Sequence, residues 1–165
     1  MRDARKLFRL FKSLVEYHKI QELLKSKGPQ HKQVINVLAR LGFFFYWIFD
    51  NIQILSKVKF IEGVDTAQMA KRAATFWLIG LLFSIAGVIV AMYETAQEEA
   101  IIVAQKKSAG GDEKQLATFK ERLHAVNKKK FDNILNLLKN LGDMVTASQA
   151  IGLPRKLLGF DFNDG

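Results

Sequence analysis

The feature that most constrains this chain is a run of 21 successive uncharged residues, Ala73–Tyr93, between Arg72 and Glu94. As an α-helix this run is about 32 Å long, which matches a bilayer hydrocarbon core about 30 Å thick. The alternative is a buried helix of a soluble protein, but few such helices stay free of charge over this length. We therefore predict an all-α membrane protein with one transmembrane helix, over about residues 66–107, and an elongated helical bundle.

Small residues recur along the uncharged run. Gly80 and Ser84 are four residues apart, and so are Gly87 and Ala91. This spacing lets another helix approach closely. We therefore expect these four positions to form a helix-packing face.

A second apolar block, Leu41–Phe49, is too short to cross a bilayer by itself. Its nine residues span only about 14 Å as a helix. Most of its side chains are aromatic, and aromatic rings favour the headgroup level of a membrane. Within a helix over about residues 30–57, the block is expected to be interfacial or buried against other helices.

The start of the chain is basic and amphipathic. Residues 1–32 contain nine Lys or Arg residues and three acidic ones, in a chain of net charge +9. Apolar residues recur with a helical period over about residues 2–25, and the predicted helix ends at Gly28 and Pro29. We expect this helix to bind a membrane surface or a partner groove; packing on the core of its own domain is the alternative.

A basic surface attracts phosphate, which can belong to nucleic acid or to anionic lipid headgroups. Charge alone does not choose between the two. In a chain with a spanning helix, our hypothesis is anionic membrane lipid, with no nucleic-acid partner.

A last amphipathic helix is expected over about residues 113–151, after a flexible hinge at 108–112. Its first half is mostly polar and basic. Its second half carries an apolar stripe with helical spacing, made of Phe131, Ile134, Leu135, Leu138, Leu141 and Val145.

No set of residues predicts catalysis. The chain has no cysteine, and its three histidines, His18, His31 and His124, stand apart without carboxylates at metal-ligand spacing. There is no phosphate-binding glycine loop or nucleophile elbow. We therefore predict no enzymatic activity, no metal and no cofactor.

Three segments of the chain carry a resemblance to a known family. They are RDARKLFRL (residues 2–10), LARLGFFFYWIFDNIQILSKV (residues 38–58) and LLKNLGDMVTASQAIGL (residues 137–153). In this order they resemble the motifs of the peroxin-11 family of peroxisome-proliferation proteins. The central segment is the most specific of the three, and Asp50 and Asn51 correspond to the family's signature pair.

The resemblance implies one helical domain over residues 1–165, in the peroxisomal membrane. It implies a protein that inserts its first helix into the cytosolic leaflet, curves the membrane, self-associates and recruits fission machinery. By this resemblance, the residues that bind lipid headgroups would be Arg2, Arg5, Lys6, Arg9 and Lys12. The residues that insert into the membrane would be Leu7, Leu10, Phe11 and Leu14.

A second hypothesis follows from a difference from the family. Its members usually have residues ahead of the Arg-Asp motif and a further glycine-rich hydrophobic helix after the last segment. A chain without them would suit a structural accessory subunit of a larger organellar complex, for example in the mitochondrial inner membrane.

Overall fold

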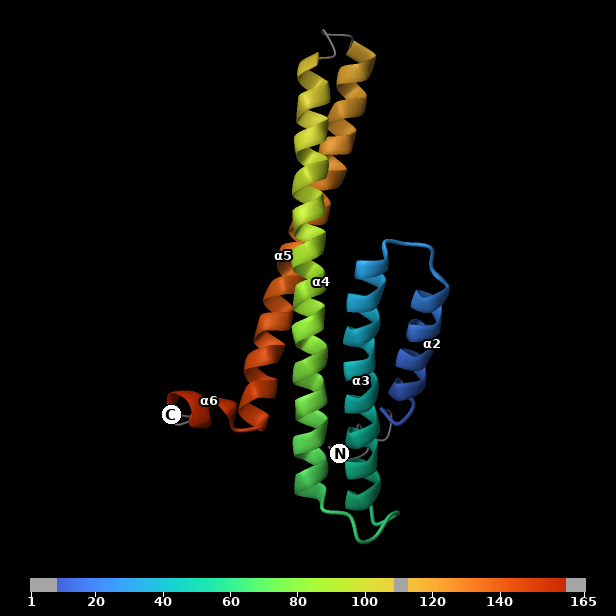
Figure 1. Cartoon of the computed structure of the whole chain (residues 1–165), viewed down its shortest axis with the longest axis vertical. Coiled ribbons are helices and arrows are strands. Elements are labelled where there is room, and N and C mark those ends of the chain that lie inside the picture. Colours follow the sequence, from blue (N-terminus) through green and yellow to red (C-terminus); the bar gives the residue numbers. More distant parts are fainter. Residues whose placement is uncertain (1–8, 109–112, 160–165) are drawn as a thin grey trace.

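The computed structural model describes residues 9–108 and 113–159, and every regular element within them is a helix. Of the helices in these residues, one is long and apolar enough to cross a membrane, and it contains the uncharged run. The predicted all-α membrane fold is therefore confirmed. With the labels of Figure 1, the helices are α2 (Lys12–Lys25), α3 (Gln30–Lys57), α4 (Thr66–Ser108), α5 (Glu113–Ala150) and α6 (Leu153–Leu158).

The ends of the helices follow from local chemistry. Pro29 stands immediately before α3, at a position where a missing N–H is harmless. The Asp65 carboxylate accepts hydrogen bonds from the backbone N–H groups of Ala67 (2.9 Å) and Gln68 (3.1 Å), which caps the start of α4. Gly152 follows α5 with a φ of 69°, a left-handed conformation that glycine adopts without strain. This turn separates α5 from α6.

The helices α2, α3, α4 and α5 lie side by side in one row, in the order in which they occur in the chain. α2 packs on α3, α3 on α4, α4 on α5, and α6 on the end of α5. Figure 1 shows α2 and α3 beside only the lower part of α4, whereas α5 follows α4 along most of its length. The upper parts of α4 and α5, residues 94–108 and 113–130, therefore form a two-helix projection, which we call the arm.

The first described helix is shorter than the helix predicted over residues 2–25. It begins at Lys12, and residues 9–11 form a turn, while residues 2–8 lie outside the described part of the chain. The side-chain amide of Asn51 donates a hydrogen bond to the Leu10 carbonyl (2.8 Å), and the backbone N–H of Leu14 bonds to the carbonyl of Phe11 (3.1 Å). The Phe11 carbonyl is thus the first acceptor of α2 after Leu10, whose own carbonyl is held by α3.

Candidate membrane-binding site

The uncharged run of α4 is turned largely outward. Only 11% of its most apolar window is buried within the chain. Leu82 and Ile89 in the middle of the run are exposed. A core helix of a soluble protein of this length would be buried on most sides, so the surroundings of α4 match a membrane-spanning helix.

α3 and α4 approach most closely at Gly42 and Gly80. A Cβ atom on Gly42 would lie 2.5 Å from the Gly80 Cα, and one on Gly80 would lie 3.1 Å from the Ala39 carbonyl oxygen. Because these obstructing atoms are backbone, no change of rotamer relieves the contact. The sequence analysis missed Gly42, because it lies among bulky aromatic residues. The pattern that could have revealed it is a pair of small residues, Ala39 and Gly42, three positions apart on one helix face.

The predicted small-residue face of α4 meets two different helices. Gly80 faces α3, and a Cβ atom on Gly87 would lie 3.4 Å from the Asn36 side-chain oxygen of α3. Ser84 instead accepts a hydrogen bond from Asn140 of α5 (3.1 Å). A packing role for Ala91 stays a prediction.

The aromatic block of α3 packs against the N-terminal end of the uncharged run. The ring of Phe76 lies 5.1 Å from that of Phe45 and 5.4 Å from that of Phe49, measured between centroids. Tyr46 stacks on Trp77 at 5.5 Å. The structure thus shows this block packed against another helix, and its interfacial position stays a prediction.

Two cations lie over the aromatic rings at this end of the row. The Lys12 ammonium is 4.6 Å from the Trp47 ring, and the Arg72 guanidinium is 6.0 Å from the Phe49 ring. Cations and aromatic rings both favour the headgroup level of a bilayer. Among the proposed headgroup-binding residues, Arg9 and Lys12 are described and exposed, whereas Arg2, Arg5 and Lys6 lie outside the described residues.

α2 meets α3 with the side that carries Glu16 and Ile20, both of which are buried. Phe11 and Leu14 are turned away and are 71% and 54% exposed. Leu10 is half-buried, and Leu7 lies outside the described residues. An amphipathic helix that docks on a soluble core buries its large apolar residues, whereas Phe11 and Leu14 of this chain are left exposed.

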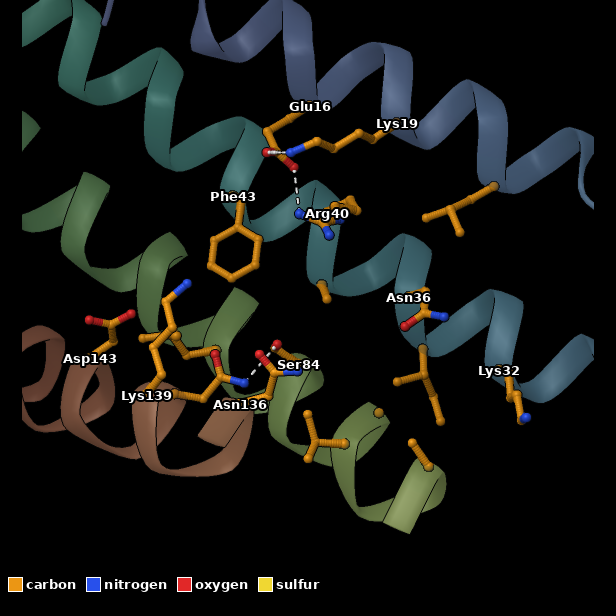
Figure 2. A pocket seen from close by; sticks show the side chains of 18 of the residues that line it. Glu16, Lys19, Lys32, Asn36, Arg40, Phe43, Ser84, Asn136, Lys139 and Asp143 are labelled. Carbon is orange, nitrogen blue, oxygen red and sulfur yellow. Dashed lines mark hydrogen bonds and ion pairs between the residues drawn. The ribbon is translucent and has the colours of Figure 1, made fainter. Parts of the chain in front are cut away.

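An ion pair joins α2 to α3. Arg40 Nη1 lies 3.2 Å from Glu16 Oε2, and Lys19 Nζ lies 2.8 Å from Glu16 Oε1, as Figure 2 shows. Two cations thus compensate a carboxylate that is almost fully removed from solvent. At the other end of α2, the Gln33 side chain donates a hydrogen bond to the Leu23 carbonyl (2.6 Å).

The signature residue Asn51 joins the end of α3 to the turn before α2. Its amide nitrogen holds the Leu10 carbonyl, while its side-chain oxygen is buried and accepts no hydrogen bond from any described residue. Asp50 next to it is half-buried. Asp50 and Asn51 belong to the sequence segment that resembles the family. The hydrogen bond to Leu10 shows in addition that Asn51 positions the turn before α2.

A groove of about 1010 Å³ opens on one side of the row, lined by residues of α2, α3, α4 and α5. Its charged residues include Glu16, Lys19, Arg40, Lys139 and Asp143, which Figure 2 shows around the same hollow. Polar side chains from helices far apart in the sequence therefore gather on one concave side.

The described residues offer surfaces for binding and no visible reaction centre. Within them, no group of three or more His, Asp or Glu side chains is placed to hold a metal ion. His18, His31 and His124 are exposed on three different helices. The arrangement can bind lipid and other helices through its apolar faces and cations.

Comparison with known proteins gives two matches. The model of the family described as peroxisomal biogenesis factor 11 matches residues 1–163. The chain is also similar to the peroxisomal membrane protein 11 homolog of Dictyostelium discoideum, with 26% identity over 160 residues, which cover 88% of this chain and 63% of that relative. The chain thus spans less than two thirds of the length of this relative. No solved structure matches the chain.

Proposed function

Because the chain belongs to the peroxisomal biogenesis factor 11 family, whose members are non-enzymatic, we propose that it binds and curves the peroxisomal membrane through its basic amphipathic helix. The family resemblance of the sequence motifs is confirmed, and the chain is a protein of the peroxisomal membrane. The mitochondrial alternative, with its structural accessory subunit, has no support from the comparisons.

The exposed apolar side chains at the start of α2 are the observation that carries this proposal. α2 lies at the edge of the row and contacts α3 alone among the described helices. Its contact with α3 uses Glu16 and Ile20, which leaves Phe11 and Leu14 free to enter hydrocarbon. An apolar helix face that no other described helix covers is what insertion into one leaflet requires.

The chemistry of the helix suits a wedge in an anionic leaflet. An amphipathic helix inserts about 5–10 Å and expands one leaflet relative to the other, so many copies bend the membrane. Arg9 and Lys12 would each add about 1 kcal/mol of attraction to anionic headgroups. Arg2, Arg5, Lys6 and Leu7 belong to the same proposed surface by their positions in the sequence.

The partners of the chain are also part of this proposal. Bending needs many copies at one place, so we expect the chain to self-associate. The resemblance to the family extends the proposal to recruitment of fission machinery. Chemical crosslinking in intact peroxisomes would detect both kinds of contact.

The test is the shape of vesicles that contain the full chain at increasing density. With anionic lipid, the wild-type protein should convert spherical vesicles into tubules, visible by electron microscopy. Leu14→Glu should abolish tubules, because a carboxylate in hydrocarbon is unfavourable.

A matched control exists in the same helix. Leu24 is 62% exposed, but it lies at the other end of α2 and outside the proposed inserting set. Leu24→Glu adds the same charge and should leave tubulation intact. Tubules of wild-type number with Leu14→Glu would contradict the proposal, and so would an equal loss in both variants.

A further inference from the structure

The helix α5 changes the face that it turns toward α4 about halfway along its length. In the arm, Val126 is 1% exposed, and Phe119 and Leu123 are half-buried. Lys120 and Lys128 are exposed on the outside. Apolar residues inside and charges outside are the arrangement that paired helices adopt in water.

Below the arm, over residues 131–150, the arrangement is reversed. Asn140 and Ala147 are buried, and the amide of Asn140 donates a hydrogen bond to the Ser84 hydroxyl of α4 (3.1 Å). Where this stretch meets the arm, the amide of Asn133 donates to the Thr95 hydroxyl (3.3 Å). The outer surface carries an exposed apolar stripe, made of Phe131, Ile134, Leu135, Leu138, Leu141 and Val145. This part of α5 thus meets α4 partly through polar and small groups.

The reversal occurs at the level where α4 itself changes character. In the arm, Lys129 Nζ pairs with Glu98 Oε2 of α4 at 2.8 Å. Below it, Asn140 lies against Ser84, inside the uncharged run that ends at Tyr93. Two helices that are neighbours in space therefore change polarity at one level, although their sequences change independently.

A boundary between water and hydrocarbon explains both changes at once. In hydrocarbon, apolar side chains gain little by turning toward another helix, whereas polar groups need partners inside the protein. As a helix, residues 131–150 are about 30 Å long, which matches the hydrocarbon core. We infer that this part of α5 lies in the membrane beside α4, with its apolar stripe against the acyl chains of lipid.

The charges in this stretch explain why its composition conceals it. Asp132, Lys139 and Asp143 lower its hydropathy, so its composition does not identify it as a membrane span. Asp132 lies at the lower end of the arm, where it lines a small hollow together with Glu98 and Lys129, and the other two charges lie deeper in the stretch. Lys139 and Asp143 line the groove together with Asn136, as Figure 2 shows, and the stripe lies elsewhere on the helix. Charged side chains within a membrane are found facing protein or a water-filled cavity, where their desolvation is compensated.

Beyond curvature by α2, this arrangement defines the path of the chain from α4 onward. α4 crosses the membrane in one direction and α5 returns in the other. The arm then projects on one side. The α3–α4 connection and α6 lie on the other side, toward the same end of the row in Figure 1.

The surroundings of the stripe can be measured with spin labels, since the chain has no cysteine of its own. The full chain is reconstituted in lipid vesicles with a nitroxide at Leu138→Cys or Leu141→Cys. The control is Ala125→Cys, an exposed position of the arm. The ratio of collisions with oxygen to collisions with a water-soluble nickel complex should be several-fold higher at the two stripe positions.

Two results would overturn the inference. A nickel collision rate at Leu138 as high as at Ala125 would place the stripe in water. Low rates for both reagents, with spin–spin broadening between copies, would mean that a second copy of the chain covers the stripe in place of lipid. Agreement between Leu138 and Leu141 guards against distortion by one substitution.

Sided labelling gives an independent answer. In sealed peroxisomes, a membrane-impermeant maleimide should distinguish Ala125→Cys in the arm from Glu62→Cys in the α3–α4 connection. Lys156→Cys in α6 should label from the same side as Glu62→Cys. Labelling of Lys156→Cys from the side of Ala125→Cys would show that α5 does not return and would overturn the inference.

Discussion

The arm and the lower part of the same helix pair are built with opposite polarity. In the arm, α4 and α5 enclose Val126 and expose their charges. Below Tyr93, α5 turns Asn140 toward α4 and leaves an apolar stripe outward. The helices, their neighbours and their antiparallel direction stay the same across this level. With the lower part in the membrane, as we infer above, the packing of α5 on α4 can leave outward an apolar face that water would disfavour.

The largest difference in stability should appear between two variants that each gain one charge, one in the apolar stripe and one in the arm. Leu138→Lys puts an ammonium against acyl chains and should reduce the stability of the inserted state by about 3 kcal/mol. Ala125→Lys makes the same addition on the exposed arm and should change stability by less than about 0.5 kcal/mol. Unfolding of both variants in lipid nanodiscs measures the difference. An equal loss of stability in the two variants would show that the stripe and the arm have the same surroundings.

The second prediction concerns the close backbone contact between α3 and α4 at Gly42 and Gly80, which lies below the arm. Gly42→Ala would push a Cβ atom into the backbone of Gly80, so α3 and α4 must separate. We expect a loss of about 2 kcal/mol in the free energy of unfolding.

The control is Gly142→Ala in α5, where an added Cβ atom has no described neighbour within 4 Å. Alanine favours the helix there, so this variant should gain about 0.5–1 kcal/mol. A neutral Gly42→Ala variant would mean that the contact between the glycines does not hold α3 on α4.

Truncation of apolar side chains should have unequal effects in the two regions. Val126→Ala leaves a cavity between the helices of the arm and should lower stability by about 1.5 kcal/mol. Leu138→Ala removes more atoms, but lipid fills the space, so its effect should be smaller. Thermal unfolding in nanodiscs tests the order, and a larger loss for Leu138→Ala would contradict it.

The smallest effects concern polar pairs. A double-mutant cycle on Lys129 and Glu98 should give a coupling of about 0.5 kcal/mol, which weakens as salt rises from about 0.1 to 1 M because exposed charges are screened. A cycle on Asn140 and Ser84 should give about 0.6 kcal/mol that salt does not change. A salt-sensitive coupling of Asn140 and Ser84 would indicate that this pair lies in water.

Much of the fold could be predicted from local patterns. The 21 uncharged residues fix a spanning helix by length, and the nine residues of Leu41–Phe49 are too few to cross by themselves. Gly28 with Pro29 and the capping carboxylate of Asp65 mark helix ends. These features depend on residues close in the sequence, whose geometry is set by the backbone.

Local sequence patterns could not predict the contacts between residues far apart in the chain. Asn51 is 41 positions from Leu10, and its side-chain amide donates a hydrogen bond to the Leu10 carbonyl. This bond holds the turn that precedes the start of α2 at Lys12. Gly42 meets Gly80 only because α3 and α4 are antiparallel and offset by a particular amount. The pairing of helices determines these contacts.

The sequence alone determined the helices over about residues 30–57, 66–107 and 113–151, the run that can cross a bilayer, and the apolar stripe within residues 131–145. It did not determine where that stripe points. A helical period shows only that apolar residues share a face, and both a protein interior and lipid accept such a face. Only the packing of α5 on α4, which fills the contact around Asn140 and Ala147, turned the stripe outward.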